Sequence, residues 1–69
     1  MKELVKSLMM SFDDEQGLPE ATYMATREIV EEIFGPDAAD MFSKYIDATD
    51  GRFYIREGAV QPMMKDIFG

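Results

Sequence analysis

The chain has 69 residues, a formal net charge of −7 at pH 7, and neither cysteine nor histidine. This length suits one small domain, residues 1–69, which disulfides cannot stabilise. Without cysteine or histidine we expect no structural zinc site. The acidic charge disfavours direct binding to nucleic acid and to anionic lipid, and it favours a protein partner with a basic surface.

The apolar runs are too short to span a membrane, and no secretory signal is apparent. The lack of cysteine fits a cytoplasmic protein, which is the location that we expect. Seven methionines supply pliable apolar side chains, for a core or for an adaptable binding surface.

The first predicted helix covers residues 2–12. One face carries its apolar residues: Leu4, Val5, Leu8, Met9 and Phe12. Acidic residues 13–15 follow at the C-terminal end, where negative charge opposes the helix dipole, and Gly17 completes a short loop. A connection this short makes the first two helices antiparallel neighbours.

The most regular helical period covers residues 19–34. Pro19 suits the first helical position, and Gly35-Pro36 ends the helix. Its apolar arc consists of Thr22, Tyr23, Thr26, Ile29, Val30, Ile33 and Phe34. Its opposite, water-facing arc consists of Glu20, Met24, Arg27, Glu28, Glu31 and Glu32. Burial of the apolar arc predicts that Ile33→Ala is among the most damaging substitutions, at a cost of about 2–5 kcal/mol.

A third helix is predicted from Pro36 to about Ala48, because the apolar residues there fit a period of 3.6 better than a period of two. Residues 52–57 alternate like a β-strand, and Pro62 begins a short fourth helix. The predicted fold is therefore mainly α, with three to four helices and one extended segment near residues 52–57. The alternative is an α+β fold with a hairpin over residues 43–57, since Asp50-Gly51 is a good hairpin signal.

Sequence motifs for chemistry are weak. Asp50, Gly51 and Glu57 fit positions five, six and twelve of an EF-hand calcium loop. Ile46 and Ala48 then occupy the first and third positions, which need side-chain oxygens, so the pattern favours a turn. We find no phosphate-binding loop and no nucleophile in a recognisable setting, and we expect neither an enzyme nor a bound cofactor.

The negative charge is concentrated in the middle of the chain. Residues 13–50 contain eleven acidic residues against Arg27 and Lys44, a net charge of −9, and the segment on each side has a net charge of +1. We expect function on the water-facing arc and the turn after it. The predicted partner-binding residues are Glu20, Met24, Glu28, Glu31, Glu32, Asp37 and Asp40. A surface that only keeps the protein soluble is the simpler interpretation.

The leading functional hypothesis is a small acidic binding module that makes stoichiometric contact with a larger protein. That protein would be basic or would process nucleic acid. In a narrower form, the acidic arc imitates nucleic acid phosphates, as phage or mobile-element inhibitors of host defence can do. The alternative is a small structural subunit of an oligomer or larger assembly, held by methionine-rich apolar faces. A homodimer would use the predicted self-association residues Phe53, Ile55, Met63, Met64 and Phe68.

Overall fold

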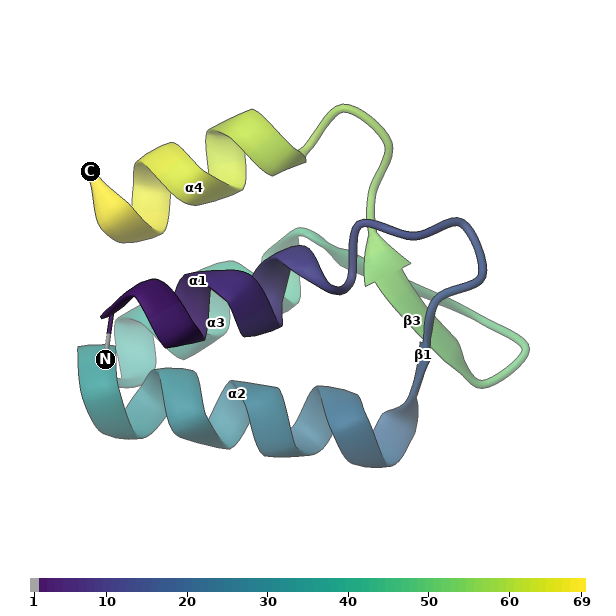
Figure 1. Cartoon of the computed structure of the whole chain (residues 1–69), viewed down its shortest axis with the longest axis horizontal. Helices are drawn as coiled ribbons and strands as arrows, with labels where there is room; N and C mark the ends of the chain where they lie inside the picture. The colour runs from purple at the N-terminus through teal and green to yellow at the C-terminus, as the bar shows by residue number, and fades with distance from the viewer. Residues whose placement is uncertain (1) are drawn as a thin grey trace.

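The computed structural model describes residues 2–69, and within them the chain forms four helices and a small three-stranded antiparallel sheet (Figure 1). The helices are α1 (Lys2–Met10), α2 (Glu20–Phe34), α3 (Pro36–Lys44) and α4 (Val60–Phe68). The strands are β1 (Leu18–Pro19), β2 (Ile46–Thr49) and β3 (Arg52–Ile55). The predicted small helical domain is therefore confirmed, and the segment between the third and fourth helices forms the alternative hairpin.

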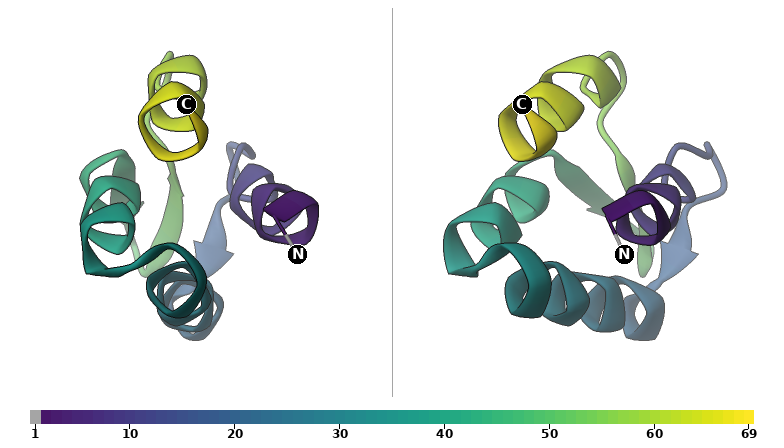
Figure 2. Two further views of the ribbon diagram at one scale, coloured as in Figure 1. Left: turned by 90° about the vertical axis from the view of Figure 1, so that its left-hand side faces the viewer. Right: turned by 60° about the vertical axis from the view of Figure 1, so that its left-hand side comes forward.

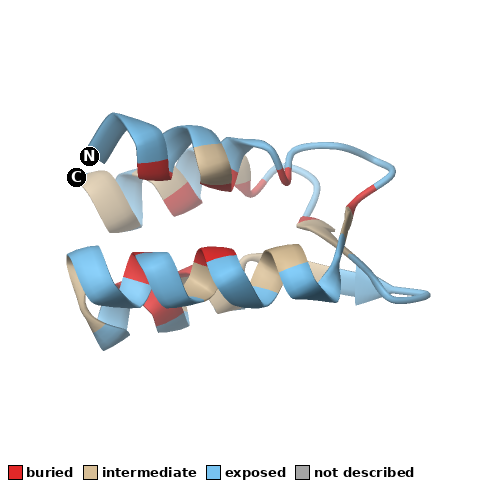
Figure 3. Ribbon diagram, turned by 60° about the horizontal axis from the view of Figure 1, so that its bottom comes forward, coloured by how far each residue is buried: buried red, intermediate tan, exposed pale blue. Residues whose placement is uncertain are grey.

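The four helices surround a common centre. Seen end-on, they follow one another around it in the order α1, α2, α3 and α4, while the strands lie at the far end (Figure 2). The start of α1 and the C-terminus lie at the opposite end from the hairpin (Figure 1). Buried positions are on the inward sides of the helices, and the outer sides are exposed (Figure 3). The outer side of α2 is thus a free surface of the chain.

The third helix ends at Lys44 rather than at Ala48, because the chain enters a hairpin there. Asp50 and Gly51 have φ angles of 53° and 76°, the left-handed values that a type I′ turn needs at both central residues. The turn sets the register of β2 and β3, which pair from Ile46 opposite Ile55 to Thr49 opposite Arg52. The prediction of a helix up to Ala48 is therefore wrong, and the Asp-Gly signal is the better guide.

β1 has no counterpart among the predicted elements. Its two residues, Leu18 and Pro19, pair with Phe53 and Arg52, which makes β3 the central strand. Pro19 is consequently extended, with φ −68° and ψ 159°, and it caps α2 instead of opening it as the first helical residue. A strand this short has no recognisable period, and its pairing is decided by β3.

The end of α1 and the start of α4 each differ by two residues from the prediction. α1 ends at Met10, and the Phe12 carbonyl beyond it accepts a hydrogen bond from the Ile55 N–H at 3.0 Å, which ties the end of the helix to the sheet. α4 begins at Val60, so Pro62 lies inside its first turn. Proline is tolerated there because the first N–H groups of a helix have no intrahelical partner.

The core lies between the helices and β3. Its fully buried side chains include Val5, Met9, Phe12, Val30, Phe42 and Met63. Where the helices meet the sheet, Tyr23 stacks on Phe53 with ring centroids 4.6 Å apart, and Phe12 meets Phe42 edge to face at 5.5 Å. Each such pair contributes about 0.5–1.5 kcal/mol beyond the burial of its area.

The face that α2 presents to the core is rotated from the predicted arc. Thr26 and Val30 are buried, but Ile29 and Ile33 are 36% and 39% exposed. Arg27, predicted to face water, instead donates hydrogen bonds to α3. The helix is therefore rotated toward α3. The prediction that Ile33 belongs to the core is wrong, because a period of 3.6 residues defines an arc only to within about one residue.

A pair of identical substitutions tests this assignment of the core. Ile55 is only 6% exposed, so Ile55→Ala should lower the free energy of unfolding by about 2–5 kcal/mol. Ile33→Ala should cost about 1 kcal/mol or less, because much of that side chain is already in water and alanine favours a helix. Urea denaturation of both variants measures the difference, and a larger loss for Ile33→Ala would contradict the rotation of α2.

Gly17 is the position where a side chain should be least tolerated. Its φ is +72°, and an added Cβ would lie 3.0 Å from the Arg52 Cβ and 3.1 Å from the Phe53 carbonyl oxygen. Gly58 is a matched control, with φ +78° and open space around it. Gly58→Ala should cost about 1–2 kcal/mol from its left-handed backbone. Gly17→Ala should cost roughly 1–3 kcal/mol more from overpacking, and equal thermal midpoints would refute the close approach of this loop to β3.

Candidate protein-binding surface

All seven predicted partner-binding residues are exposed. α2 carries five of them: Glu20, Met24, Glu28, Glu31 and Glu32. Asp37 and Asp40 are on α3, which follows after the single residue Gly35. The seven residues thus come from two helices that pack against each other, and together we call them the acidic surface.

Arg27 shows how the acidic surface is arranged on α2. Its Nε donates to the Ser43 Oγ at 2.7 Å, and its Nη2 donates to Asp40 at 2.8 Å, so this flank of α2 faces α3. Three members of the surface share that flank by helical spacing: Glu20, Met24 and Glu31. Glu28 and Glu32 are turned further outward, away from α3.

The same contacts bring Asp40 and Ser43 of α3 beside α2. The Tyr23 hydroxyl also donates to the Ser43 Oγ, at 2.8 Å, so one serine oxygen accepts two hydrogen bonds from α2. Asp40 is paired with Arg27 and contributes less net charge than its position in the sequence indicated. Sequence reasoning placed Arg27 in the water-facing arc and missed this pair, because the two residues are far apart along the chain.

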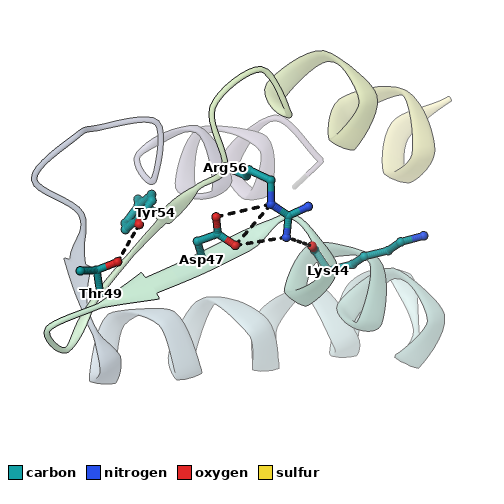
Figure 4. A network of polar contacts seen from close by, with 5 residues as sticks. All are labelled: Lys44, Asp47, Thr49, Tyr54 and Arg56. Atoms are coloured by element: carbon teal, nitrogen blue, oxygen red, sulfur yellow. Dashed lines mark hydrogen bonds and ion pairs between the residues drawn. The ribbon is translucent and has the colours of Figure 1, made fainter.

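Most of the acidic surface keeps its charge unpaired. Within residues 2–69, the ion pairs join Arg27 to Asp40 and Arg56 to Asp47. Arg56 also donates to the Lys44 carbonyl at 3.1 Å, so this guanidinium braces the hairpin instead of neutralising α2 (Figure 4). The remaining carboxylates of the surface therefore produce a negative field on the outer side of α2.

A second acidic feature was not predicted as a site. An open hollow of about 480 Å³ lies where the loop after α1 meets β3. It is lined by Asp13, Asp14, Glu15, Tyr54, Ile55 and Glu57. Sequence reasoning treated the loop only as a helix end. In the part of the chain that the structure describes, no group of three acidic residues is arranged to hold a metal ion.

The predicted self-association residues are used largely inside the chain. Ile55 and Met63 are buried in the core, so they cannot reach a second copy while the domain stays folded. Phe53, Met64 and Phe68 are half-buried, and Phe68 meets Phe34 edge to face at 5.3 Å. The burial of Ile55 and Met63 is set by the fold, and self-association through the other three residues stays a prediction. The homodimer itself stays a prediction.

Comparisons of the chain with family models, with curated proteins and with solved structures found no match. None of the helices in residues 2–69 has the length and apolar character needed to cross a membrane. That the protein is not an enzyme stays a prediction.

Tyr45 provides a test by pH. Its hydroxyl donates to the Asp66 carboxylate, and this hydrogen bond raises the pKa of Tyr45 above 10.0, because a deprotonated tyrosine could not donate and would face a negative charge. The bond should stabilise the fold below about pH 10 and be lost as pH rises through the raised pKa. Tyr45→Phe should thus have a lower thermal midpoint than the unmodified chain at pH 8, and the two midpoints should converge at alkaline pH. A constant difference would contradict this role.

Proposed function

We propose that this protein is a small binding module that makes stoichiometric contact with a basic surface of a larger protein. The observation that carries the proposal is the acidic surface. Its residues are exposed, and of its six carboxylates Asp40 is the one with an ion pair within residues 2–69. Unpaired charges gathered on two adjoining helices attract a basic partner and orient its approach.

Met24 gives this surface an apolar contact. Its side chain is 56% exposed and shares a flank of α2 with Glu20 and Glu31. Interfaces combine an apolar centre with a polar rim, and a flexible thioether adapts to different partner shapes. Charge steers the encounter at long range, and burial of Met24 slows dissociation once the two proteins have met.

The spacing of the carboxylates supports a narrower form, in which the partner is a nucleic-acid-processing protein and α2 occupies its nucleic acid groove. From Glu20 to Glu32 the helix rises about 18 Å, and four carboxylates lie along this length. One strand of DNA carries roughly five phosphates over the same distance. The number of carboxylates along α2 is thus close to the number of phosphates on one nucleic acid strand of the same length.

The structural-subunit alternative has less support. It requires methionine-rich apolar faces, but Met9 and Met63 are fully buried within the chain. Met10 and Met24 are the exposed methionines among residues 2–69, and they are on different helices. The exposed methionines therefore do not gather on one helix face.

Charge reversal tests the proposal. Glu28→Lys combined with Glu31→Lys should reduce capture of a basic protein from cell lysate at least tenfold at low salt, mainly through a slower association rate. The control, Asp13→Lys with Glu57→Lys, changes the net charge equally but lies at the hollow, and it should retain capture. Mass spectrometry identifies the bound protein, and 0.5 M salt should weaken its binding.

Equal retention in both double variants would mean that the acidic surface serves solubility only. Equal loss in both would mean that total charge, and not α2, attracts the partner. Circular dichroism should show that both variants are folded, since all four positions are exposed.

A further inference from the structure

Four apolar side chains on two helices lie outside the core, and we call them the strip: Leu4 and Leu8 on α1, and Ile29 and Ile33 on α2. Leu4 is 59% exposed and Leu8 is half-buried. Among residues 2–69, the strip contains three of the five large apolar side chains that are exposed. Exposed apolar area gathered in one place is typical of a contact surface.

On α2, the two isoleucines are turned toward α1. The end-on views place α2 between α1 and α3 (Figure 2). Arg27 marks the flank that faces α3, through its hydrogen bonds to Ser43 and Asp40. Ile29 and Ile33 lie on the other side of the helix axis from Arg27, at 100° per residue, so their flank faces α1.

On α1, the two leucines are turned toward α2. The same views place α1 between α4 and α2 (Figure 2). The Lys6 Nζ lies 5.7 Å from the centroid of the Phe68 ring, so the Lys6 flank faces α4. Val5 and Met9 point into the core. Leu4 and Leu8 lie on the flank opposite Lys6, which faces α2. Because α1 and α2 run in opposite directions, the Leu4 end of the strip lies at the Ile33 end (Figure 1).

Acidic residues border the strip on both helices. Glu3 precedes Leu4, Glu28 precedes Ile29, and Glu32 precedes Ile33. In each case the acidic side chain lies one helical step further outward and is exposed. Ser7 precedes Leu8 in the same way. None of the four residues that directly precede a residue of the strip is therefore basic.

We propose that this strip is the docking site for a basic amphipathic helix of the partner, an inference that rests on the proposed binding function. Apolar side chains one turn apart on the incoming helix would pack on the strip, and lysine or arginine beside them would meet the acidic borders. A second copy of this chain fits poorly, because it would set Glu28 and Glu32 against identical carboxylates.

Two synthetic peptides test this inference. One is a helix with leucine at positions i, i+4 and i+7 and lysine elsewhere, and the other has the same composition in scrambled order. The full chain should bind the amphipathic peptide at least tenfold more tightly than the scrambled one, by isothermal titration calorimetry. The methyl signals of Leu4, Leu8, Ile29 and Ile33 should shift on binding in NMR spectra.

Matched variants separate the strip from general apolar exposure. Leu4→Gln and Ile29→Gln should each weaken binding of the amphipathic peptide several-fold, and at least tenfold in combination. Met10→Gln is the control, because Met10 is exposed on the same helix as Leu4 but lies outside the strip. It should leave the affinity unchanged. Thermal midpoints should show that all the variants are folded.

Equal binding of the two peptides, or equal loss in Met10→Gln and Leu4→Gln, would overturn the docking site. Suppose that the docking site were overturned but Glu28→Lys with Glu31→Lys still weakened the binding of both peptides. The proposed binding function of the acidic surface would then survive without the docking site. If neither peptide bound at low salt, both proposals would fall. Sedimentation velocity could also show that the chain forms a dimer and that Leu4→Gln abolishes it. The strip would then bind a second copy instead of a basic helix, and the inference would be overturned.

Discussion

The packing of α2 against α3 is the constraint on which the surface of this protein depends. Tyr23 and Arg27 both donate to the Ser43 Oγ, and Tyr23 also stacks on Phe42 with ring centroids 5.8 Å apart. The exposed Arg27–Asp40 pair is worth at most about 1 kcal/mol. Burial of a side chain such as Phe42 contributes about 1.5–3 kcal/mol. Aromatic packing therefore supplies most of the stability of the contact between α2 and α3, and the hydrogen bonds of Arg27 help to fix the orientation of α2.

The rotation of α2 decides what a partner meets. It brings Val30 into the core and leaves Ile29 and Ile33 at the border with α1. It also turns Glu28 and Glu32 outward. One helix therefore has three functions in our proposals: it closes the core, provides one wall of an apolar strip, and carries the charge that would attract a basic partner.

Small size explains why such a strip exists. A chain of this length buries only about 60% of the surface that its unfolded form exposes, so not every apolar side chain can enter the core. Acidic residues placed one step outward from the exposed apolar ones would repel the same residues of a second copy. The same arrangement is complementary to a basic helix, so solubility and selective binding can have one physical origin.

Features with a local cause could be predicted from the sequence. Each helix has apolar residues at a period of 3.6 within one continuous segment, so all four were recognised, with ends displaced by up to one turn. The Asp50-Gly51 turn also has a local cause, because few residue pairs tolerate positive φ at two successive positions. The exposure of the acidic surface followed from the same periods, since charged residues avoid a core without partners.

By itself, then, the sequence determined the helices, the hairpin turn and the side of α2 that carries its charge. The tertiary structure alone decided β1, the Arg27–Asp40 pair and the exposure of Ile29 and Ile33. The physical reason is that these features depend on contacts between segments far apart in the chain. A helical period indicates an apolar side, but the neighbouring helices decide which residues of that side they cover and which they leave in water.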